Sequence, residues 1–181
     1  MKKSLEKWYI DFVRKAAKKE ENIDIDNSSV DHAVLVIEEL IRYASKNIYI
    51  LTDEFKDKFY RLLDTTLINF LKKGGKIYIL SYNDISNNEF LKDLKNRFPK
   101  NIFVKKVLKE DKPKLFVEKQ QKYINFILND KKGVRYELDE KLNDLTTRAI
   151  VNYGDEETHD LFKQVFDKYF ERGEEVKFDK S

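Results

Sequence analysis

The chain has 181 residues, 41% of them hydrophobic and 13% aromatic, which is enough apolar material for one domain with a core of its own. Its 36 basic and 33 acidic residues nearly cancel, so the net charge of +3 argues against a surface built throughout for nucleic acid. The chain contains no cysteine, which excludes disulfides, thiol nucleophiles and thiolate metal sites and agrees with the reducing cytoplasm, where we expect the protein to be located.

The amino-terminal segment is predicted to be an amphipathic helix followed by a polar link. Charges interrupt each of its apolar runs, so a signal peptide is not expected. The link covers residues 21–29, and Ser29 is predicted to cap a second helix that ends near Ser45. The apolar residues that recur at helical spacing are Leu5, Trp8, Tyr9, Phe12, Val13 and Ala16 in the first helix and Ala33, Val36, Ile37, Leu40, Ile41 and Ala44 in the second.

The middle of the chain alternates between predicted strands and helices. Residues 47–51 and 76–82 have the branched and aromatic content of short buried strands, and the helical pattern between them is ended by the Gly-Gly pair at 74–75. A further helix (residues 87–98) and a further strand (residues 101–108) follow. This βαβαβ order predicts parallel strands with helices packed across them.

The last third of the chain is predicted to add antiparallel or mixed strands to the same sheet, because four short strand-like runs follow one another without a helix-length insert. These runs are residues 115–121, 122–129, 133–138 and 148–153. A strong helix over residues 155–173 closes the pattern, with Asp155, Glu156 and Glu157 at its positive end. The sequence therefore predicts an α/β fold, with a mixed, largely parallel sheet flanked by helices and an extra amino-terminal helix.

The phrase VIEELIRYASKNIYILTDEF (residues 36–55), followed by FLKKGGKIYIL (residues 70–80), resembles the opening of a phospholipase D-like domain. The apolar strand and aromatic-rich helix at AIVNYGDEETHDLFKQVFDKYF resemble the usual ending of that family. The resemblance covers about residues 31–173. It implies an amino-terminal helix and link at residues 1–27, a phospholipase D-like α/β domain at residues 28–175 and a tail at residues 176–181.

Members of that family carry an H-x-K-x4-D motif on a late strand, where the His attacks phosphorus and the Lys binds the phosphate. The resemblance places this frame on Tyr123, Asn125 and Asp130, and only the Asp matches. Residues two apart on a strand point to the same face, so we expect Tyr123 and Asn125 to lie side by side in a cleft that Asp130 completes. A phenol, with a pKa of about 10, needs positive charge around it to attack at neutral pH, and Asn125 removes the nearest one.

The sequence therefore predicts a site with no catalytic residue, in which Tyr123, Asn125 and Asp130 bind a polar or phosphate-bearing ligand. If the site is active, Tyr123 and Asp130 are the candidates. The two histidines, His32 and His159, fall on predicted helices, and neither is followed by a Lys two positions on, so we interpret them as solvated or capping-region residues. No spacing typical of a zinc site is present, and we predict no metal and no cofactor.

A second enzymatic interpretation starts from the acidic residues of the same region. Asp130 with the Asp-Glu-Lys run at 139–141 loosely fits a nuclease hairpin that holds Mg²⁺ between carboxylates. Strand alternation groups Arg135 and Glu137 with Asp139, opposite apolar positions, and this is more typical of the outward charged face of an edge strand. A phosphodiesterase or nuclease with an atypical or metal-dependent site stays the alternative function.

The preferred function is that of a non-catalytic binding or assembly protein, with regulation of a protein partner as a further alternative. Single-motif members of the family form dimers that bring two motifs to one cleft, so the resemblance implies a homodimer. The face formed by Trp8, Tyr9 and Phe12 is expected to pack on its own domain, with a partner or second copy as the alternative. Nucleic acid is not favoured because acidic residues dilute each basic run, and no membrane is expected because no stretch approaches ~20 apolar residues.

Overall fold

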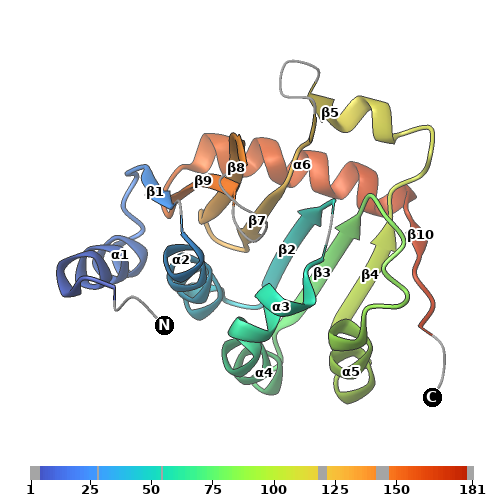
Figure 1. Ribbon diagram of the computed structural model, residues 1–181, viewed down its shortest axis with the longest axis horizontal. Helices are drawn as coiled ribbons and strands as arrows, with labels where there is room; N and C mark the ends of the chain where they lie inside the picture. Colours follow the sequence, from blue (N-terminus) through green and yellow to red (C-terminus); the bar gives the residue numbers. More distant parts are fainter. Residues whose placement is uncertain (1–4, 28, 54, 118–121, 142–146, 179–181) are drawn as a thin grey trace.

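Eight strands form one mixed sheet in the order β1-β9-β8-β7-β2-β3-β4-β10 in the computed structural model of the protein, which confirms the predicted α/β fold class (Figure 1). The described residues are 5–27, 29–53, 55–117, 122–141 and 147–178. Strands β2 (Asn47–Thr52), β3 (Lys76–Ser81) and β4 (Ile102–Lys106) run parallel, as the βαβαβ pattern predicts. Their alternation places isoleucines toward one face and aromatic rings toward the other.

Antiparallel strands extend the sheet on both sides of this parallel centre. Next to β2 lies β7 (Phe126–Asn129), followed by β8 (Val134–Lys141), β9 (Thr147–Asn152) and β1 (Ile25–Asn27), while β10 (Glu174–Glu175) pairs with β4. The first of the four predicted runs departs from the expectation. Its strand β5 (Phe116–Val117) pairs with β6 (Lys122–Tyr123) in a separate two-stranded sheet.

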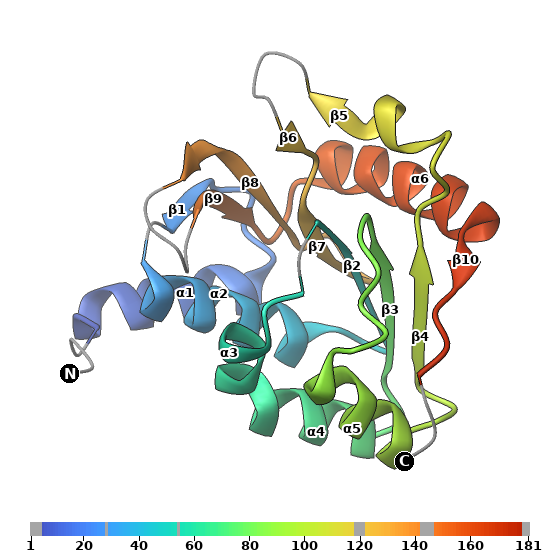
Figure 2. The same cartoon turned by 45° about the vertical axis from the view of Figure 1, so that its right-hand side comes forward.

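Helices cover the two faces of the sheet unequally. Helices α2 (Val30–Tyr43), α4 (Asp64–Lys72) and α5 (Glu89–Arg97) lie on one face, and α6 (Glu156–Arg172) crosses the other (Figures 1 and 2). The helix expected between β2 and β3 is interrupted, because α3 (Asp57–Tyr60) and the 3-10 turn η1 (Arg61–Leu63) precede α4. A second 3-10 turn, η2 (Lys112–Leu115), leads into β5.

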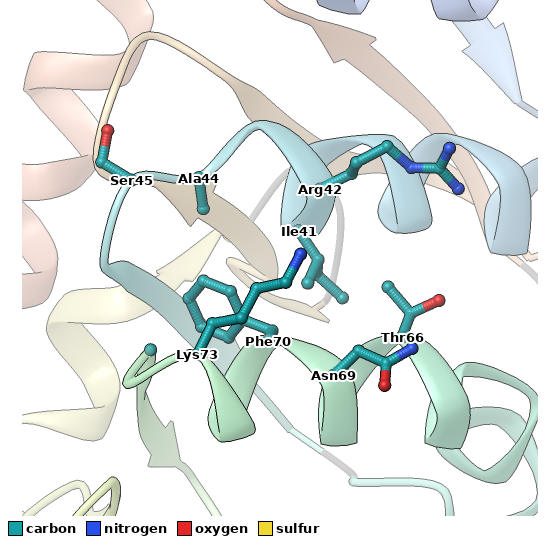
Figure 3. A pocket seen from close by; sticks show the side chains of 9 residues that line it. Ile41, Arg42, Ala44, Ser45, Thr66, Asn69, Phe70 and Lys73 are labelled. Atoms are coloured by element: carbon teal, nitrogen blue, oxygen red, sulfur yellow. The ribbon is translucent and has the colours of Figure 1, made fainter.

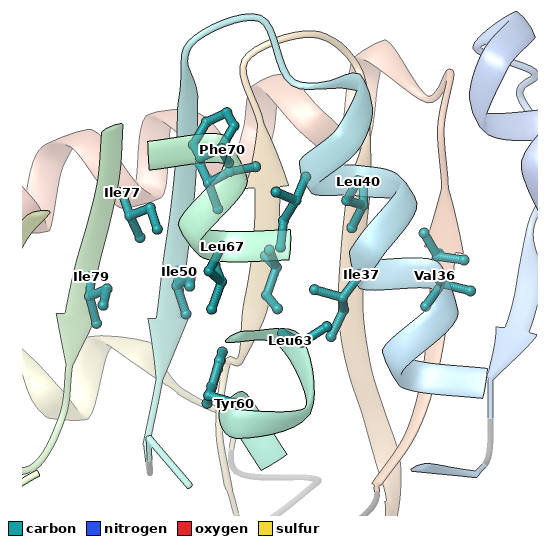
Figure 4. Packing of buried hydrophobic residues seen from close by; sticks show 14 of the residues in the cluster. Val36, Ile37, Leu40, Ile50, Tyr60, Leu63, Leu67, Phe70, Ile77 and Ile79 are labelled. Carbon is teal, nitrogen blue, oxygen red and sulfur yellow. The ribbon is translucent and has the colours of Figure 1, made fainter. Parts of the chain in front are cut away.

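The larger of two hydrophobic clusters lies between the sheet and the helices of the first face. Ile37 of α2 and Leu67 of α4 point toward Ile50, Ile77 and Ile79 of β2 and β3 (Figure 4). Burying each such side chain stabilises the fold by about 1.5–3 kcal/mol. The second cluster lies under α6 on the opposite face and is rich in aromatic rings.

Capping side chains fix the starts of α2 and α6. Ser29 accepts a hydrogen bond from the His32 amide at 3.1 Å, and Asp155 accepts one from the Thr158 amide at 3.0 Å. The acidic first turn predicted for α6 is present. The position of Gly75, just after α4, requires a glycine, because a Cβ there would come within 2.5 Å of the Phe70 ring.

The amino-terminal segment packs against the rest of the fold through α1 and β1. Helix α1 (Lys7–Lys19) buries Tyr9 and Val13 in the larger cluster, whereas Trp8 is 64% exposed and Phe12 is 36% exposed. The predicted face is therefore split between two sides of the helix. The predicted link contains β1, which pairs with β9. No helix within the described ranges has the length and apolar character needed to cross a membrane.

Candidate functional site

The candidate site lies where β2 and β3 end and β7 begins. Because β7 runs antiparallel to β2 with Phe126 opposite Leu51, Asn125 lies beside the last residues of β2. Strand β8 continues the sheet on the other side, with Tyr136 opposite Phe126. The carboxyl ends of parallel strands are where α/β sheets most often bind ligands, so the fold itself points to this edge.

The Asn125 carboxamide is held by the protein at both ends. Its Oδ1 accepts a hydrogen bond from the Asp53 amide at 2.8 Å, and its Nδ2 donates to Glu137 Oε2 at 3.2 Å. The main chain adds a third link, in which the Glu137 amide donates to the Asn125 carbonyl at 3.1 Å. Asn125 is only 7% exposed. Its side chain thus bridges β2 and β8 as an internal connector.

Arg135 supplies a cation behind this bridge, but its charge is compensated within the protein. Its Nη1 lies 3.6 Å from Glu137 Oε1, and its Nε donates to Asn27 Oδ1 at 3.1 Å. The side chain is 7% exposed. Burial lowers the pKa of Arg135, and the neighbouring Glu137 carboxylate opposes that shift. The guanidinium is therefore paired and out of reach of a ligand in solvent.

The loops that follow β2 and β3 are tied together at the same edge. Asn83 donates from Nδ2 to the Asp53 carbonyl at 2.7 Å, and Asn88 donates to the Phe55 carbonyl at 2.8 Å. Phe55 stacks on Tyr60 with ring centroids 3.7 Å apart. Burial raises the pKa of the Tyr60 phenol, so this hydroxyl stays neutral and cannot act as a phenolate at neutral pH.

Tyr123 lies in a different environment from Asn125. Its ring stacks on Tyr82 with centroids 4.3 Å apart and packs edge-on to Phe116 at 5.3 Å. Both Tyr123 and Tyr82 belong to the cluster under α6, and the Tyr82 hydroxyl donates to the Ile124 carbonyl at 2.8 Å. Burial raises the pKa of Tyr82 far above its usual value.

A break between β6 and β7 removes the basis of the expectation that Tyr123 and Asn125 project side by side. Before the break the chain pairs with η2, since the Ile124 amide donates to the Leu115 carbonyl at 3.1 Å. After it, Asn125 bonds to β8 through its carbonyl. The alternation rule that puts residues two apart on one face requires a continuous strand, and here the strand changes partner between the two residues.

Asp130 lies at the opposite end of β7, about 16 Å of extended chain from Asn125. Its carboxylate accepts hydrogen bonds from three consecutive amides after α2, those of Ser45 at 2.7 Å, Lys46 at 2.7 Å and Asn47 at 3.0 Å. The structure thus does not place Asp130 in one cleft with Tyr123 and Asn125. That these residues bind a ligand stays a prediction.

The structure also locates the two histidines and the charged residues of β8 that the sequence analysis considered. His159 is buried in α6, with Nε2 2.8 Å from the Asn129 carbonyl, so it is not a solvated residue. His32 stacks on Tyr9 with centroids 4.2 Å apart. Strand β8 lies between β7 and β9, so the edge-strand interpretation of Arg135 and its neighbours is wrong. The side chains of the Asp-Glu-Lys run at 139–141 lie outside the described residues.

Sequence reasoning missed three polar groups of this edge, Asp53, Asn83 and Glu137. Two of them could have been found from the sequence, because Asp53 and Asn83 come at the carboxyl ends of predicted parallel strands, where ligands most often bind. Glu137 had no comparable signal, since its partner Arg135 becomes buried only through the strand order. Across the described part of the chain, no three His, Asp or Glu side chains gather into a metal-binding group.

Comparison with known proteins shows which solved structures share this fold. No protein-family model matches the chain, and no curated protein does. Among solved structures, Nuc from Salmonella typhimurium, a phospholipase D family member, is similar with a TM-score of 0.59 at 12% identity over 84% of this chain and 97% of Nuc. The fold is phospholipase D-like. The sequence resemblance to that fold is thereby confirmed.

Two further similar structures widen the range of proteins that share this fold. TrmBL2, described as an archaeal chromatin protein with a novel mode of DNA binding, has a TM-score of 0.62 at 17% identity over 92% of this chain. This chain spans 60% of the length of TrmBL2. The phosphatidylserine synthase of Haemophilus influenzae has a TM-score of 0.54 at 14% identity over 84% of this chain and 39% of the enzyme. At these identities the likeness concerns the fold alone.

Proposed function

We propose that this phospholipase D-like domain does not use phosphohistidine chemistry and acts as a binding or assembly protein. The observation that carries the proposal is the Asn125 bridge. Asn125 occupies the position that the phosphate-binding Lys has in the motif, and both ends of its side chain form hydrogen bonds within the protein, to the Asp53 amide and to Glu137. A carboxamide carries no positive charge, and one that is held at both ends in this way does not replace the ammonium group that clamps a phosphate. The same frame puts Tyr123 where the nucleophile belongs, and its ring stacks on Tyr82 and packs edge-on against Phe116.

The charge of the edge supports the same conclusion. Phosphoryl transfer needs fixed positive groups around the reacting oxygens. The buried cation of this edge, Arg135, is paired with Glu137. Burial is the main reason that the pKa of the nearby Tyr60 phenol is raised, while Arg135 lowers this pKa and Glu137 and Asp53 raise it. The positive charge of Arg135 is therefore balanced by a carboxylate and is not left over to bind an anionic substrate.

A hydrolysis assay tests the proposal. The full chain is incubated with bis(p-nitrophenyl) phosphate and with supercoiled plasmid, each with and without Mg²⁺. We expect no product above that of a matched preparation of Tyr123→Phe. Hydrolysis that requires Mg²⁺, or that disappears in Tyr123→Phe or Asp130→Asn while the fold is kept, would instead establish the alternative of a phosphodiesterase or nuclease with an atypical site.

Assembly as a homodimer is part of the proposal. It is supported by the two large rings that α1 leaves at the surface, Trp8 and Phe12, which lie one helical turn apart. Aromatic side chains in such a position are typical centres of protein interfaces. Light scattering of the full chain is expected to give twice the monomer mass. The double variant Trp8→Ala, Phe12→Ala is expected to shift the measured mass toward that of the monomer. A monomeric wild type at high protein concentration would contradict this part.

Nucleic-acid binding is a second candidate, because TrmBL2 has the same fold and is described by its mode of DNA binding. Its test is fluorescence anisotropy with labelled duplex DNA at several salt concentrations. Binding by this chain would show an affinity that falls steeply with salt, since contacts to phosphates release counterions. Anisotropy that stays flat at low salt would remove this candidate.

A further inference from the structure

A pocket of about 370 Å³ lies between α2 and α4, at the end of the sheet opposite the candidate site. Its size is at the lower end of the range of small-molecule sites, about 300–1,000 Å³. Figure 3 shows Lys73 reaching from the end of α4 toward Ile41 of α2, with Asn69 and Thr66 along α4. The full lining is Ile41, Arg42, Ala44, Ser45, Thr66, Asn69, Phe70, Lys73 and Gly75.

The lining combines an apolar floor with unequal charge. Ile41 and Phe70 are buried and form the floor, while Arg42 and Lys73 bring two positive charges and no lining residue is acidic. Two carboxylates touch the lining from outside. Glu38 accepts a hydrogen bond from Thr66 at 3.3 Å, and Glu39 lies 3.7 Å from Arg42.

Several polar groups of the pocket have no partner within the described ranges of the chain. The side chains of Ser45, Asn69 and Lys73 form no hydrogen bond or ion pair there. The carbonyls of Phe70 and Leu71 near the end of α4 already accept hydrogen bonds from the amides of Gly75 and Gly74, at 3.1 and 3.0 Å. The Lys73 ammonium is therefore not needed to cap the helix and can serve a ligand.

The pocket wall at Ser45 is held in place by Asp130, which directly follows β7 and is far from Ser45 in the sequence. The Asp130 carboxylate binds the Ser45 amide at 2.7 Å, together with the two amides that follow. Three charge-assisted hydrogen bonds fix the course of this loop before any ligand arrives. Preorganisation of this kind lowers the entropic cost of binding.

We propose that this pocket binds a small organic anion, whose carboxylate or phosphate group pairs with Lys73 while its apolar body rests on Ile41 and Phe70. The Ser45 hydroxyl and the Asn69 amide supply further hydrogen bonds to the same group. The site is separate from the edge where Asn125 lies, so it holds whether or not that edge binds a ligand.

The test is an NMR titration of the full ¹⁵N-labelled chain with benzoate and with phenyl phosphate, against neutral benzamide of matched shape. We expect the anions to shift the amides of Ser45, Lys73 and Gly75 and the Asn69 side chain saturably, and benzamide not to. Lys73→Met, which keeps the length of the side chain, is expected to raise Kd about tenfold, the effect of roughly 1.4 kcal/mol. Lys72→Met, one position away on the exposed side of α4, serves as the matched control.

Three results would overturn the proposal. Signals of the pocket that stay unmoved by both anions well above about 1 mM would exclude a specific site. Equal weakening by Lys72→Met would reduce the effect to general charge attraction. Shifts that map to Asn125 and its neighbours would move the ligand to the opposite edge of the sheet.

Discussion

Replacing Asp130 separates a structural role for this carboxylate from a role in binding or chemistry. Three amides donate to it, those of Ser45 and Lys46 at exposed positions and that of Asn47 at a half-buried one. A hydrogen bond to a charged group contributes about 1.5–3 kcal/mol, and neighbouring bonds are not additive. We therefore expect Asp130→Ala to lower the free energy of unfolding by about 3 kcal/mol, or the melting temperature by roughly 6–12 °C.

Urea unfolding followed by circular dichroism measures this change, and Asp93 offers a matched control. Asp93 pairs with Arg97 in an exposed (i, i+4) ion pair on α5, so Asp93→Ala is expected to cost only about 0.3–0.5 kcal/mol. Asp130→Asn keeps the shape of the side chain but turns an amide N–H toward one of the donors. Its cost in free energy of unfolding should therefore lie between those of Asp130→Ala and Asp93→Ala. A cost for Asp130→Ala no larger than that for Asp93→Ala would refute the structural role.

Two further changes probe other parts of the fold. Glu39 is 1% exposed, and burial raises its pKa against the opposing charges of Arg42 and Arg14. A raised pKa in the folded state means that the neutral acid is favoured, so wild type should lose stability relative to Glu39→Gln as pH rises through and above the ordinary range of a glutamate. Unfolding free energies of both proteins between pH 4 and 8 measure this, and a difference that is constant or of opposite slope would contradict it. Gly154→Ala would bring a Cβ within 2.1 Å of the Glu20 carbonyl, so we expect a loss of about 2 kcal/mol or more, whereas Gly74→Ala has open space and should cost about 1 kcal/mol through its positive φ alone. Equal costs in thermal unfolding would argue against the close contact at Gly154.

The parts of the fold that depend on local periodicity could be read from the sequence. The isoleucines of β2 and β3 alternate strictly, and the caps at Ser29 and Asp155 are local side-chain signals. Strand β1 was hidden because it has three residues, with Asp26 between two buried positions, and gains its stability only by pairing with β9.

The candidate site depended on contacts that no local pattern encodes. Asn125 and Asp130 flank β7 at its two ends, and the break before β7 separates Tyr123 from Asn125. The burial of Arg135 follows from the position of β8 inside the sheet, which the sequence of its charged residues does not reveal. Asp130 matches the resembled motif, and its partners are backbone amides, which sequence reasoning cannot assign.

The central proposal, that the Tyr123 and Asn125 positions do not perform phosphoryl transfer, is tested most directly by intact-mass spectrometry. The full chain is incubated with a phosphodiester substrate, quenched in acid and weighed beside Tyr123→Phe. We expect both proteins to keep their unmodified masses. A phosphoryl or nucleotidyl adduct on wild type that is absent from Tyr123→Phe would contradict the account, because it would show a working nucleophile at Tyr123.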